Sequence, residues 1–331
     1  MKHVNWLLVG AGKIAQRRVA LALSQAEGSR LIAVCSRQKE QAKSLANQFG
    51  AREVFVDFTE ALSATSAEAV YLATPVWLHA PQAVQALTAG RHVLVEKPLG
   101  LSAAECSTVV AAAERSGKFA SCAYYRRFYP RYRYTKTMLD AVNLGPIVSV
   151  NMTYSSWFDP APDDPGFWRV VKAKSGGGPI CDMGSHMFDV MIGLFGLPRS
   201  VSAQCASLVR RWDVEDCAAI NMRLQNGASA QSRLNWNSKT WQHEFSILGT
   251  EARIDWSPYD SGPVIKTVGR NVEQLQLPSV ENVHLPLVED FVDSILANRS
   301  PLFPLMEALK TNTLIDAIYQ SAHSGVEVKI N

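Results

Sequence analysis

The stretch LVGAGKIAQ, residues 8–16, decides the fold of this chain. It places glycine, glycine and alanine at G-x-G-x-x-A spacing, directly after a short apolar strand pattern over residues 4–9. In this context Gly10 permits a tight turn, Gly12 lets backbone approach a pyrophosphate, and Ala15 allows close helix packing. An ordinary strand–helix turn shares this spacing. The pattern that follows favours a dinucleotide-binding turn, whose helix N-terminus offers free amides to phosphates.

Short apolar segments alternate with helical patterns through the first third of the chain. The expected strands cover residues 4–9, 30–36, 53–57, 67–75, 91–98 and 118–125, and the expected helices cover 12–24, 38–50, 79–89 and 102–116. Parallel strands need crossover connections, which are right-handed and cover both faces of the sheet. Residues 1–123 are therefore predicted to form a Rossmann domain, an α/β fold with a doubly wound parallel sheet.

Beyond residue 124, strand-like segments follow one another with few helices between them. Asn226 and Gly227 lie between two alternating segments and predict a β-hairpin. Helices are expected near 181–195, 287–298 and 304–323, and 158–168 is expected to be a long ordered loop. Residues 124–331 are thus predicted to form an α+β domain with a large, mostly antiparallel open sheet.

The composition excludes several classes of protein. A net charge of +3 over 331 residues is too small to predict binding to nucleic acid or a membrane surface. The six cysteines form no CxxC pair and no zinc-like spacing, which is typical of a reduced, cytoplasmic enzyme. The densest basic stretch is YYRRFYPRYRYTK, residues 124–136. We expect its arginines to face solvent or a small anionic ligand, although aromatic interleaving also occurs in single-strand binding proteins.

The residues after the second strand decide which dinucleotide is expected. An acidic side chain there would bind both ribose hydroxyls of NAD, but this chain has Ser36 followed by Arg37. A hydroxyl and a guanidinium suit a 2′-phosphate, and Lys39 adds positive charge. NADP is therefore predicted in preference to NAD, with a solvated surface role for Arg37 as the alternative.

Lys97 is the first candidate catalytic residue. The sequence VEKPL places Glu96 and Lys97 at the carboxyl end of the fifth expected strand, and Pro98 fixes the turn that follows. Ligands of open α/β sheets bind outside these strand ends, so both side chains are expected at the cofactor cleft. A partly buried lysine beside a cofactor suits proton transfer, whereas a lysine at an ordinary strand end is a surface residue.

A second candidate centre lies in SGGGPICDMGSHMFDVM, residues 175–191. Asp182 and His186 are four residues apart, so on a helix they share one face, and Asp189 follows three residues later. The glycines at 176–178 are expected to let the backbone approach a ligand, and the carboxylate and imidazole to manage a hydroxyl proton. No metal is expected, because the further ligands of a metal site are missing. A helix cap and a core histidine are the structural alternative.

These motifs together resemble the Gfo/Idh/MocA family of glucose–fructose oxidoreductase, inositol dehydrogenase and MocA-like proteins. GAGKIA, ATPVWLHA, VLVEKPL, YYRRFYP and GGGPICDMGSHMFD occur in the family's order and span nearly the whole chain. The resemblance implies NAD(P)-dependent oxidation or reduction of sugars, polyols or related carbonyls. It also implies that Lys97, Asp182 and His186 are catalytic, with His186 favoured for proton transfer and Lys97 for positioning.

The motifs and the resemblance give a full set of site predictions. The loop after the fourth strand matches one that contacts ribose and nicotinamide, and Trp168 with Arg169 match a pair that reaches the cofactor in some reductases. The cofactor is expected to contact Gly10, Ala11, Gly12, Lys13, Ile14, Ala15, Ser36, Arg37, Thr74, Pro75, His79, Glu96, Lys97, Trp168 and Arg169. The substrate is expected to contact Lys97, Tyr125, Arg127, Tyr154, Trp157, Asp182 and His186. Tyr154 and Trp157 offer rings on which a sugar stacks, and Tyr125 stands where many members have asparagine.

Three functions are compatible with these residues. The first is an oxidoreductase that transfers hydride between NADP(H) and a carbohydrate-like substrate, as a homodimer or homotetramer whose second sheet is covered by a partner. The second is a regulator that senses NAD(P) without turnover, although the presence of Lys97, Asp182 and His186 favours an enzyme. The third is an NAD-retaining, glycoside-cleaving member of the family, against which Ser36 and Arg37 count.

Overall fold

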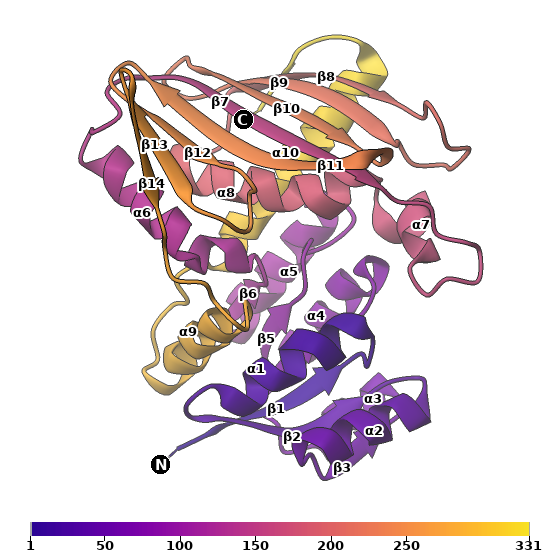
Figure 1. Cartoon of the computed structure of the whole chain (residues 1–331). Helices are drawn as coiled ribbons and strands as arrows, with labels where there is room; N and C mark the ends of the chain where they lie inside the picture. The colour runs from indigo at the N-terminus through magenta and orange to yellow at the C-terminus, as the bar shows by residue number, and fades with distance from the viewer. Residues whose placement is uncertain (1, 331) are drawn as a thin grey trace. The chain divides into compact units, whose positions relative to one another are not determined.

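The computed structural model describes residues 2–330, which form two compact units. Unit 1 contains the chain up to Tyr125 together with Val280–Leu309 (Figure 1). Unit 2 contains Arg126–Ser279 together with the chain from Lys310 onward. The first crossing lies close to the boundary expected after residue 123, whereas the return of Val280–Leu309 to unit 1 was not predicted.

The returning segment carries α9 (Leu285–Leu296), which packs against the first strand of unit 1. Its apolar side buries Val288, Phe291 and Val292 completely. The ring of Phe291 lies 5.8 Å from that of Trp6, also fully buried. Burial of this apolar surface is the physical reason that a segment so late in the sequence completes the first unit.

Unit 1 is built on a six-stranded parallel sheet, as the sequence predicts. Its strands are β1 (Val4–Val9), β2 (Ser29–Cys35), β3 (Glu53–Phe55), β4 (Ala69–Leu72), β5 (His92–Val95) and β6 (Ala120–Cys122). They lie in the order β3-β2-β1-β4-β5-β6 and all pairs are parallel. The strand order reverses between β1 and β4, which is the switch point where ligands of doubly wound sheets bind. The doubly wound fold is therefore confirmed.

The helices of unit 1 follow the predicted alternation with one addition. Besides α9, unit 1 contains η1 (Ala15–Val19), α1 (Ala20–Gln25), α2 (Lys39–Phe49), α3 (Phe58–Ala64), η2 (Val76–Leu78), α4 (His79–Thr88) and α5 (Ala103–Ser116). The short helix α3 was not predicted. The side chain of Asp57 caps it by accepting a 2.8 Å hydrogen bond from the amide of Glu60.

Unit 2 contains a nine-stranded, mostly antiparallel sheet. The strands are β7 (Ile147–Trp157), β8 (Ser200–Ala206), β9 (Cys217–Arg223), β10 (Ser229–Asn235), β11 (Asn237–Gly249), β12 (Arg253–Trp256), β13 (Val264–Val268), β14 (Asn271–Leu275) and β15 (Val328–Lys329). Their order is β14-β13-β12-β11-β7-β10-β9-β8-β15, and only β7 and β10 pair in parallel. The predicted hairpin joins β9 and β10, with Gly227 at φ +88° in its turn. The α+β fold of this half is confirmed.

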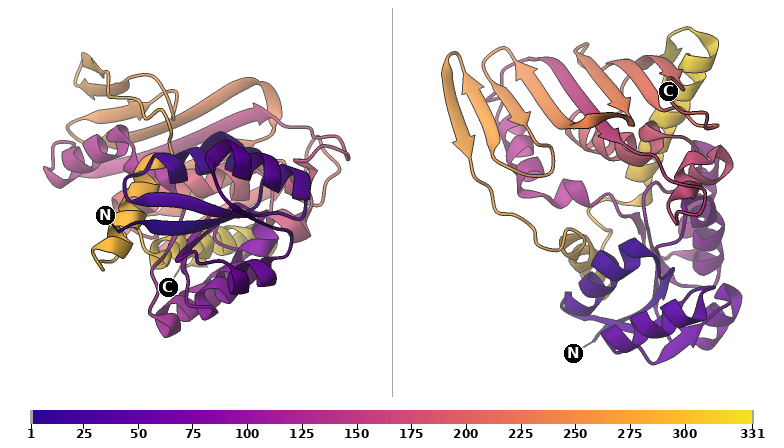
Figure 2. Two further views of the ribbon diagram at one scale, coloured as in Figure 1. Left: turned by 90° about the horizontal axis from the view of Figure 1, so that it is seen from below. Right: turned by 45° about the vertical axis from the view of Figure 1, so that its right-hand side comes forward.

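One face of the second sheet is covered by helices of the same unit (Figures 1 and 2). These are α6 (Pro130–Asp140), the π-helical turn η5 (Ile180–Gly184), α8 (Ser185–Phe195) and the later part of α10 (Leu305–Ser324). Along β10, Ala230 and Leu234 are buried beneath them, while Gln231 and Arg233 are exposed on the other side. The outward residues of this strand are polar, so β10 itself places no apolar side chain on the open face.

The arginine-rich stretch corrects one sequence-based expectation. Its arginines were expected to face solvent or a small anion. Arg133 is exposed as expected, but Arg126, Arg127 and Arg131 are buried. Arg127 forms an ion pair with Asp189 in which both side chains are 2% exposed, and Arg131 donates to the backbone carbonyls of 258, 259, 261 and 262. Partners so far away along the chain leave no local signal in the sequence.

Replacing Asp189 by alanine is expected to destabilise unit 2 strongly. The variant takes the carboxylate away from the buried guanidinium of Arg127, a change that typically costs about 3–5 kcal/mol. Urea unfolding followed by circular dichroism measures the loss. Asp140→Ala, which breaks an exposed pair with Lys136, is the control and is expected to cost less than about 0.5 kcal/mol. Equal losses in the two variants would contradict a structural role for the buried pair.

Candidate functional site

The turn after β1 has the backbone geometry that a dinucleotide requires. Gly10 has φ +97°, and a Cβ there would lie 2.6 Å from the carbonyl oxygen of Ala73, so only glycine fits. A Cβ on Gly12 would meet no atom within 4 Å, which leaves open space above the turn. The amide of Gln16 donates to the carbonyl of Gly12 at 3.1 Å, so the amides before it have no acceptor within the helix. Open space and unused amide donors together fit a pyrophosphate.

The end of β2 presents positive charge beside this turn. β2 pairs with β1 from Ser29 to Cys35, so the residues that follow it leave the sheet at the same edge as the glycine turn. Ser36 accepts a hydrogen bond from the amide of Gln38 at 3.3 Å. Arg37 and Lys39 are exposed, and neither forms an ion pair with another residue between 2 and 330. Two accessible cations and the absence of an acid after the strand fit a phosphorylated ribose.

His79 fixes the loop after β4. Both of its ring nitrogens lie 2.7 Å from backbone carbonyl oxygens, one of Pro98 and the other of Thr74. The side chain is 1% exposed, and the hydroxyl of Thr74 donates to Gln82 at 2.7 Å. His79 therefore connects the loop after β4 to the turn after β5. Its expected role at the cofactor is thus to position this loop.

Glu96 is a buried residue at the end of β5. Its Oε1 accepts hydrogen bonds from the hydroxyl of Tyr71 at 3.0 Å and from the ring of His284 at 2.9 Å. Burial acts to raise the pKa of Glu96, but the contacts with His284 and Tyr71 hold it below its usual range. The amide of the half-buried Lys97 donates to the other carboxylate oxygen at 3.3 Å. Three hydrogen-bond donors thus fix Glu96 next to Lys97, and its contact with a cofactor stays a prediction.

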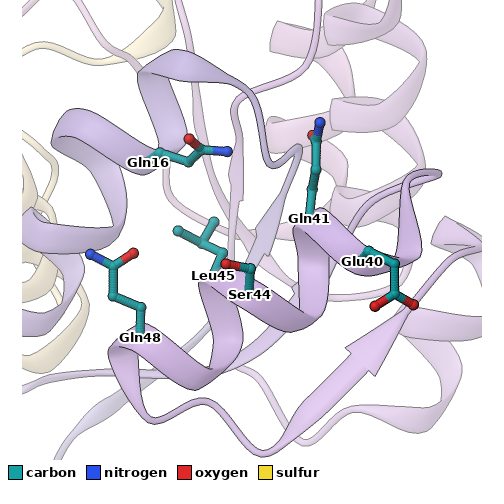
Figure 3. A pocket seen from close by; sticks show the side chains of 6 residues that line it. All are labelled: Gln16, Glu40, Gln41, Ser44, Leu45 and Gln48. Carbon is teal, nitrogen blue, oxygen red and sulfur yellow. The ribbon is translucent and has the colours of Figure 1, made fainter.

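A surface pocket of about 320 Å³ lies between η1 and α2 in unit 1 (Figure 3). It is lined by Gln16, Glu40, Gln41, Ser44, Leu45 and Gln48. None of these is a predicted site residue, and the one charge among them is a carboxylate, which repels phosphate. The lining of this pocket therefore gives no support to a phosphate-binding role.

In unit 2, Asp182 and His186 lie on one continuous helix made of η5 and α8. The carboxylate of Asp182 is 34% exposed, and the Nε of Arg169 lies 3.9 Å from it. The guanidinium of Arg169 also packs 4.6 Å from the ring of Trp168. Unit 2 thus brings the expected Trp168–Arg169 pair to one of the candidate catalytic groups.

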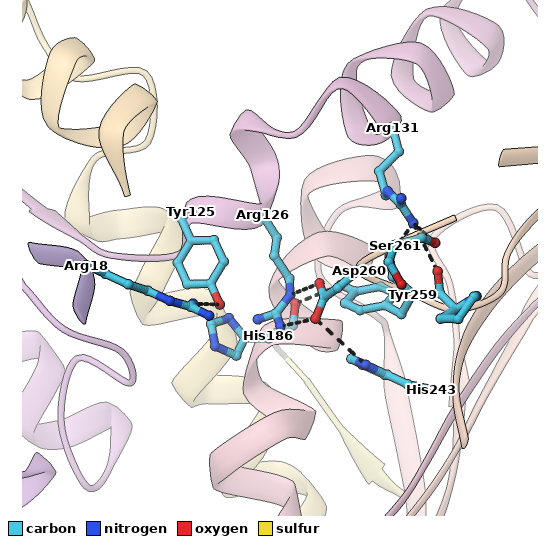
Figure 4. Close-up of polar contacts among 10 residues, drawn as sticks. Arg18, Tyr125, Arg126, Arg131, His186, His243, Tyr259, Asp260 and Ser261 are labelled. Atoms are coloured by element: carbon cyan, nitrogen blue, oxygen red, sulfur yellow. Dashed lines mark hydrogen bonds and ion pairs between the residues drawn. The ribbon is translucent and has the colours of Figure 1, made fainter. Parts of the chain in front are cut away.

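A polar and aromatic cluster next to this helix was missed in the sequence (Figure 4). Arg126 holds Asp260 through two hydrogen bonds of 2.7 and 2.6 Å, and Asp260 lies 3.8 Å from Nδ1 of His243. His243 packs against the ring of Tyr154, and Tyr259 donates to the carbonyl of His186 at 3.4 Å. Burial raises the pKa of Tyr154, and the charge of Asp182 acts in the same direction. Tyr154 and the helix of His186 therefore share one neighbourhood.

Three further expected substrate contacts pack against other groups of the protein. Arg127 is paired with Asp189, which favours a structural role. Tyr125 is 6% exposed in unit 1, and its ring packs 4.8 Å from that of His284. Trp157 is 45% exposed at the end of β7, where the guanidinium of Arg210 lies 4.3 Å from its ring.

The chain matches two family models. Residues 4–124 match the oxidoreductase family with an NAD-binding Rossmann fold, and residues 132–255 match the Gfo/Idh/MocA C-terminal domain. An uncharacterized oxidoreductase of Rhizobium meliloti is 31% identical over 98% of each chain. This chain therefore belongs to the Gfo/Idh/MocA family of NAD(P)-binding oxidoreductases.

Two further relatives extend this finding. A D-xylose 1-dehydrogenase (NADP(+)) of Haloferax volcanii is 26% identical over 98% of this chain and 99% of its own. The crystal structure of the aldose–aldose oxidoreductase of Caulobacter crescentus, complexed with glycerol, superimposes with a TM-score of 0.91. It is 25% identical and covers 99% of this chain and 100% of that one. The whole architecture, both units included, is thus that of an oxidoreductase.

Residues 2–330 contain no helix that is long and apolar enough to cross a membrane. No group of three or more histidine, cysteine, aspartate or glutamate side chains in the same range is arranged to hold a metal ion.

Alanine substitutions at the two glycines of the first turn are expected to change different properties, stability at Gly10 and cofactor affinity at Gly12. Gly10→Ala forces a Cβ against the backbone of Ala73 at positive φ, so it should lower the thermal unfolding temperature. Gly12→Ala meets no protein atom, so it should leave stability unchanged and weaken dinucleotide binding by roughly tenfold or more. Differential scanning fluorimetry and a fluorescence titration with NADPH measure the two effects. Unchanged NADPH affinity in Gly12→Ala would contradict the proposed pyrophosphate contact.

His243 is expected to make unit 2 sensitive to acid. Burial lowers the pKa of His243 to about 4, with Asp260 opposing the shift and Arg126 adding to it. The unfolded chain therefore binds a proton below about pH 6.5 that the folded chain binds only near pH 4, so stability falls as the pH drops between these values.

His243→Phe keeps a ring against Tyr154 and removes this titration. Its loss of stability between pH 7 and pH 4.5 should be smaller than that of the wild type by about 2–3 kcal/mol. Urea unfolding at the two pH values measures it, and exposed His323, changed to Gln, is the control. The same pH dependence in His243→Phe and the wild type would refute the assignment.

Proposed function

We propose that this protein is an NADP(H)-preferring oxidoreductase that transfers hydride between the nicotinamide and a carbon of a sugar, polyol or related ketone. The observation that carries the cofactor preference is the exposed Arg37, which follows Ser36 where an acid would bind the ribose of NAD. The similarity to a D-xylose 1-dehydrogenase (NADP(+)) supports both the cofactor and the substrate class.

The proposed roles are divided between the two units. When bound, the nicotinamide supplies or accepts the hydride. Lys97 of unit 1 holds a substrate hydroxyl and assists its proton transfer. His186 of unit 2 gives or takes the proton on the substrate oxygen, and Asp182 orients either His186 or a hydroxyl. The partial exposure of Asp182 and its neighbourhood with Tyr154 support this assignment, since a sugar stacks on a tyrosine ring.

We further propose that the protein works in the cytoplasm as a homodimer or homotetramer and has no nucleic-acid or membrane partner. The open face of the nine-stranded sheet is the surface through which a second copy would pair, as the family resemblance implies. Polar outward residues such as Gln231 and Arg233 favour hydrogen bonding over apolar contact at that surface. Light scattering after size exclusion measures the number of subunits.

Arg37→Ala is expected to weaken NADPH binding by about tenfold to hundredfold, the loss expected when a charge-assisted hydrogen bond to phosphate is removed. NADH binding should change by less than about twofold, because NADH carries no 2′-phosphate. Fluorescence titration of the purified protein with each cofactor measures both constants. Arg30→Ala removes the same charge at the opposite, exposed end of β2 and is the matched control.

The alternatives give different results in the same titration. Preference for NADH, or equal NADPH affinity in Arg37→Ala and the wild type, would overturn the NADP assignment and support the cofactor-retaining glycosidase. Tight NADPH binding without turnover of any sugar, polyol or ketone would support a regulator. A kinetic assay of NADPH oxidation with a panel of keto sugars separates these outcomes.

A further inference from the structure

We propose that Glu215 and Tyr319 are positioning residues that fix the beginning of the helix carrying Asp182 and His186. The proposal rests on the proposed function, because it matters to catalysis only if that helix does. It concerns unit 2 alone, and neither residue was a predicted member of the site.

The contacts converge on a single carboxylate. Oε2 of Glu215 accepts a hydrogen bond from the amide of Gly178 at 3.0 Å, and Oε1 accepts one from the amide of Ile180 at 3.1 Å. The hydroxyl of Tyr319 on α10 lies 3.0 Å from each of these oxygens. Glu215 is 8% exposed and stands just before β9. One side chain therefore joins a strand, a long helix and the beginning of the candidate catalytic helix.

The glycines of the run 176–178 serve this contact. A Cβ on Gly178 would lie 1.9 Å from the carbonyl oxygen of Glu215, and a Cβ on Gly177 would lie 1.8 Å from the hydroxyl of Tyr319. No side chain fits in either place. The sequence predicted that these glycines let a ligand approach, whereas at Gly177 and Gly178 the closely approaching groups belong to the protein itself.

The energetics favour a fixed geometry. Burial raises the pKa of Glu215, and its hydrogen-bond donors oppose that rise. The ion pairs found among residues 2–330 include none with this carboxylate, so backbone amides and one hydroxyl replace a cation. The amides of a helix N-terminus carry partial positive charge, which makes them good partners for a carboxylate. Removing one donor would leave an oxygen of the buried carboxylate without a hydrogen bond. The free-energy cost of that loss favours a single geometry of Glu215 and its donors.

The connection to the candidate catalytic groups is short. The amide of Asp182 donates to the carbonyl of Gly178 at 3.1 Å. The backbone of Asp182 is therefore hydrogen-bonded directly to the residue whose amide binds Glu215. His186 lies one helical turn further on in the same continuous helix. A shift of the helix beginning therefore moves both side chains together.

The neighbouring Asp216 shows what the same device does elsewhere. Its carboxylate accepts hydrogen bonds of 2.8, 2.9 and 2.8 Å from the amides of 208, 209 and 210 and fixes that loop. Two consecutive acidic residues thus bind the amides of two separate backbone turns. Glu215 binds the turn before Asp182, and Asp216 binds the loop at 208–210.

Tyr319→Phe and Glu215→Leu test the proposal, and Glu215→Gln, which keeps one acceptor oxygen, is the conservative variant. Hydrogen exchange measured by mass spectrometry should show faster exchange in the peptide covering 176–186, by about tenfold to hundredfold for the loss of a charge-assisted hydrogen bond. Exchange in β9 and β10 should stay unchanged. Glu215→Gln should lie between the wild type and Glu215→Leu.

Kinetics give the second readout. With the wild type active on its best substrate, kcat should fall by at least roughly tenfold in Tyr319→Phe, while the Kd for NADPH stays within about twofold. Ser321→Ala is the matched control, because it removes a buried hydroxyl on the same helix that bonds to Ala203 and the carbonyl of Val326. It should change neither kcat nor exchange at 176–186.

The outcomes separate this proposal from the proposed function. Unchanged exchange at 176–186 in both Tyr319→Phe and Glu215→Leu would overturn the positioning role, whether or not the protein shows turnover. Faster exchange with an unchanged kcat would also overturn it. A wild type without turnover on any substrate would count against the proposed function, and the exchange result would still decide whether Glu215 holds the helix.

Discussion

A carboxylate buried away from water needs hydrogen-bond donors around it. This constraint applies to a glutamate next to the candidate catalytic residues in each unit. In unit 1 the donors to Glu96 are Tyr71, His284 and the amide of the next residue, Lys97. In unit 2 the donors to Glu215 are two amides at the beginning of the helix that carries Asp182 and the hydroxyl of Tyr319. Each buried carboxylate uses donors from segments far apart in sequence, so the backbone beside each candidate catalytic group is held from several directions.

The elements built from local patterns were predictable from the sequence. The parallel strands of unit 1 are short apolar runs, and the hairpin at 225–228 has turn residues that require its geometry. The glycine turn after β1 was also predicted, because its G-x-G-x-x-A spacing lies within one short stretch of sequence. The close approach of Gly10 to the backbone of Ala73, just after β4, was seen only in the structure. The hydrogen-bond partners that lie far apart in sequence could not be predicted; Asp260 as the partner of Arg126 is an example.

The candidate site illustrates the same limit. The sequence pointed to Lys97, Asp182 and His186 because each lies in a short motif. His243, Tyr259 and Asp260 lie in no motif, and the folding of β11 and of the segment after β12 brings them beside the helix of His186. The glycine run was noticed for the right reason, close backbone approach, but the approaching groups are Glu215 and Tyr319. Residue types predicted the chemistry, and tertiary packing decided which groups are buried supports and which are exposed.

In the proposed reaction a hydride passes between the nicotinamide and a substrate carbon, and side chains of the protein transfer the proton. The most direct measurement uses NADPH carrying deuterium at both C4 positions and a keto sugar that the enzyme reduces, with the product analysed by mass spectrometry. Hydride transfer predicts one deuterium bonded to carbon in the product and an equal amount of oxidised cofactor. Product that contains no deuterium, or substrate cleavage without net cofactor oxidation, would contradict it.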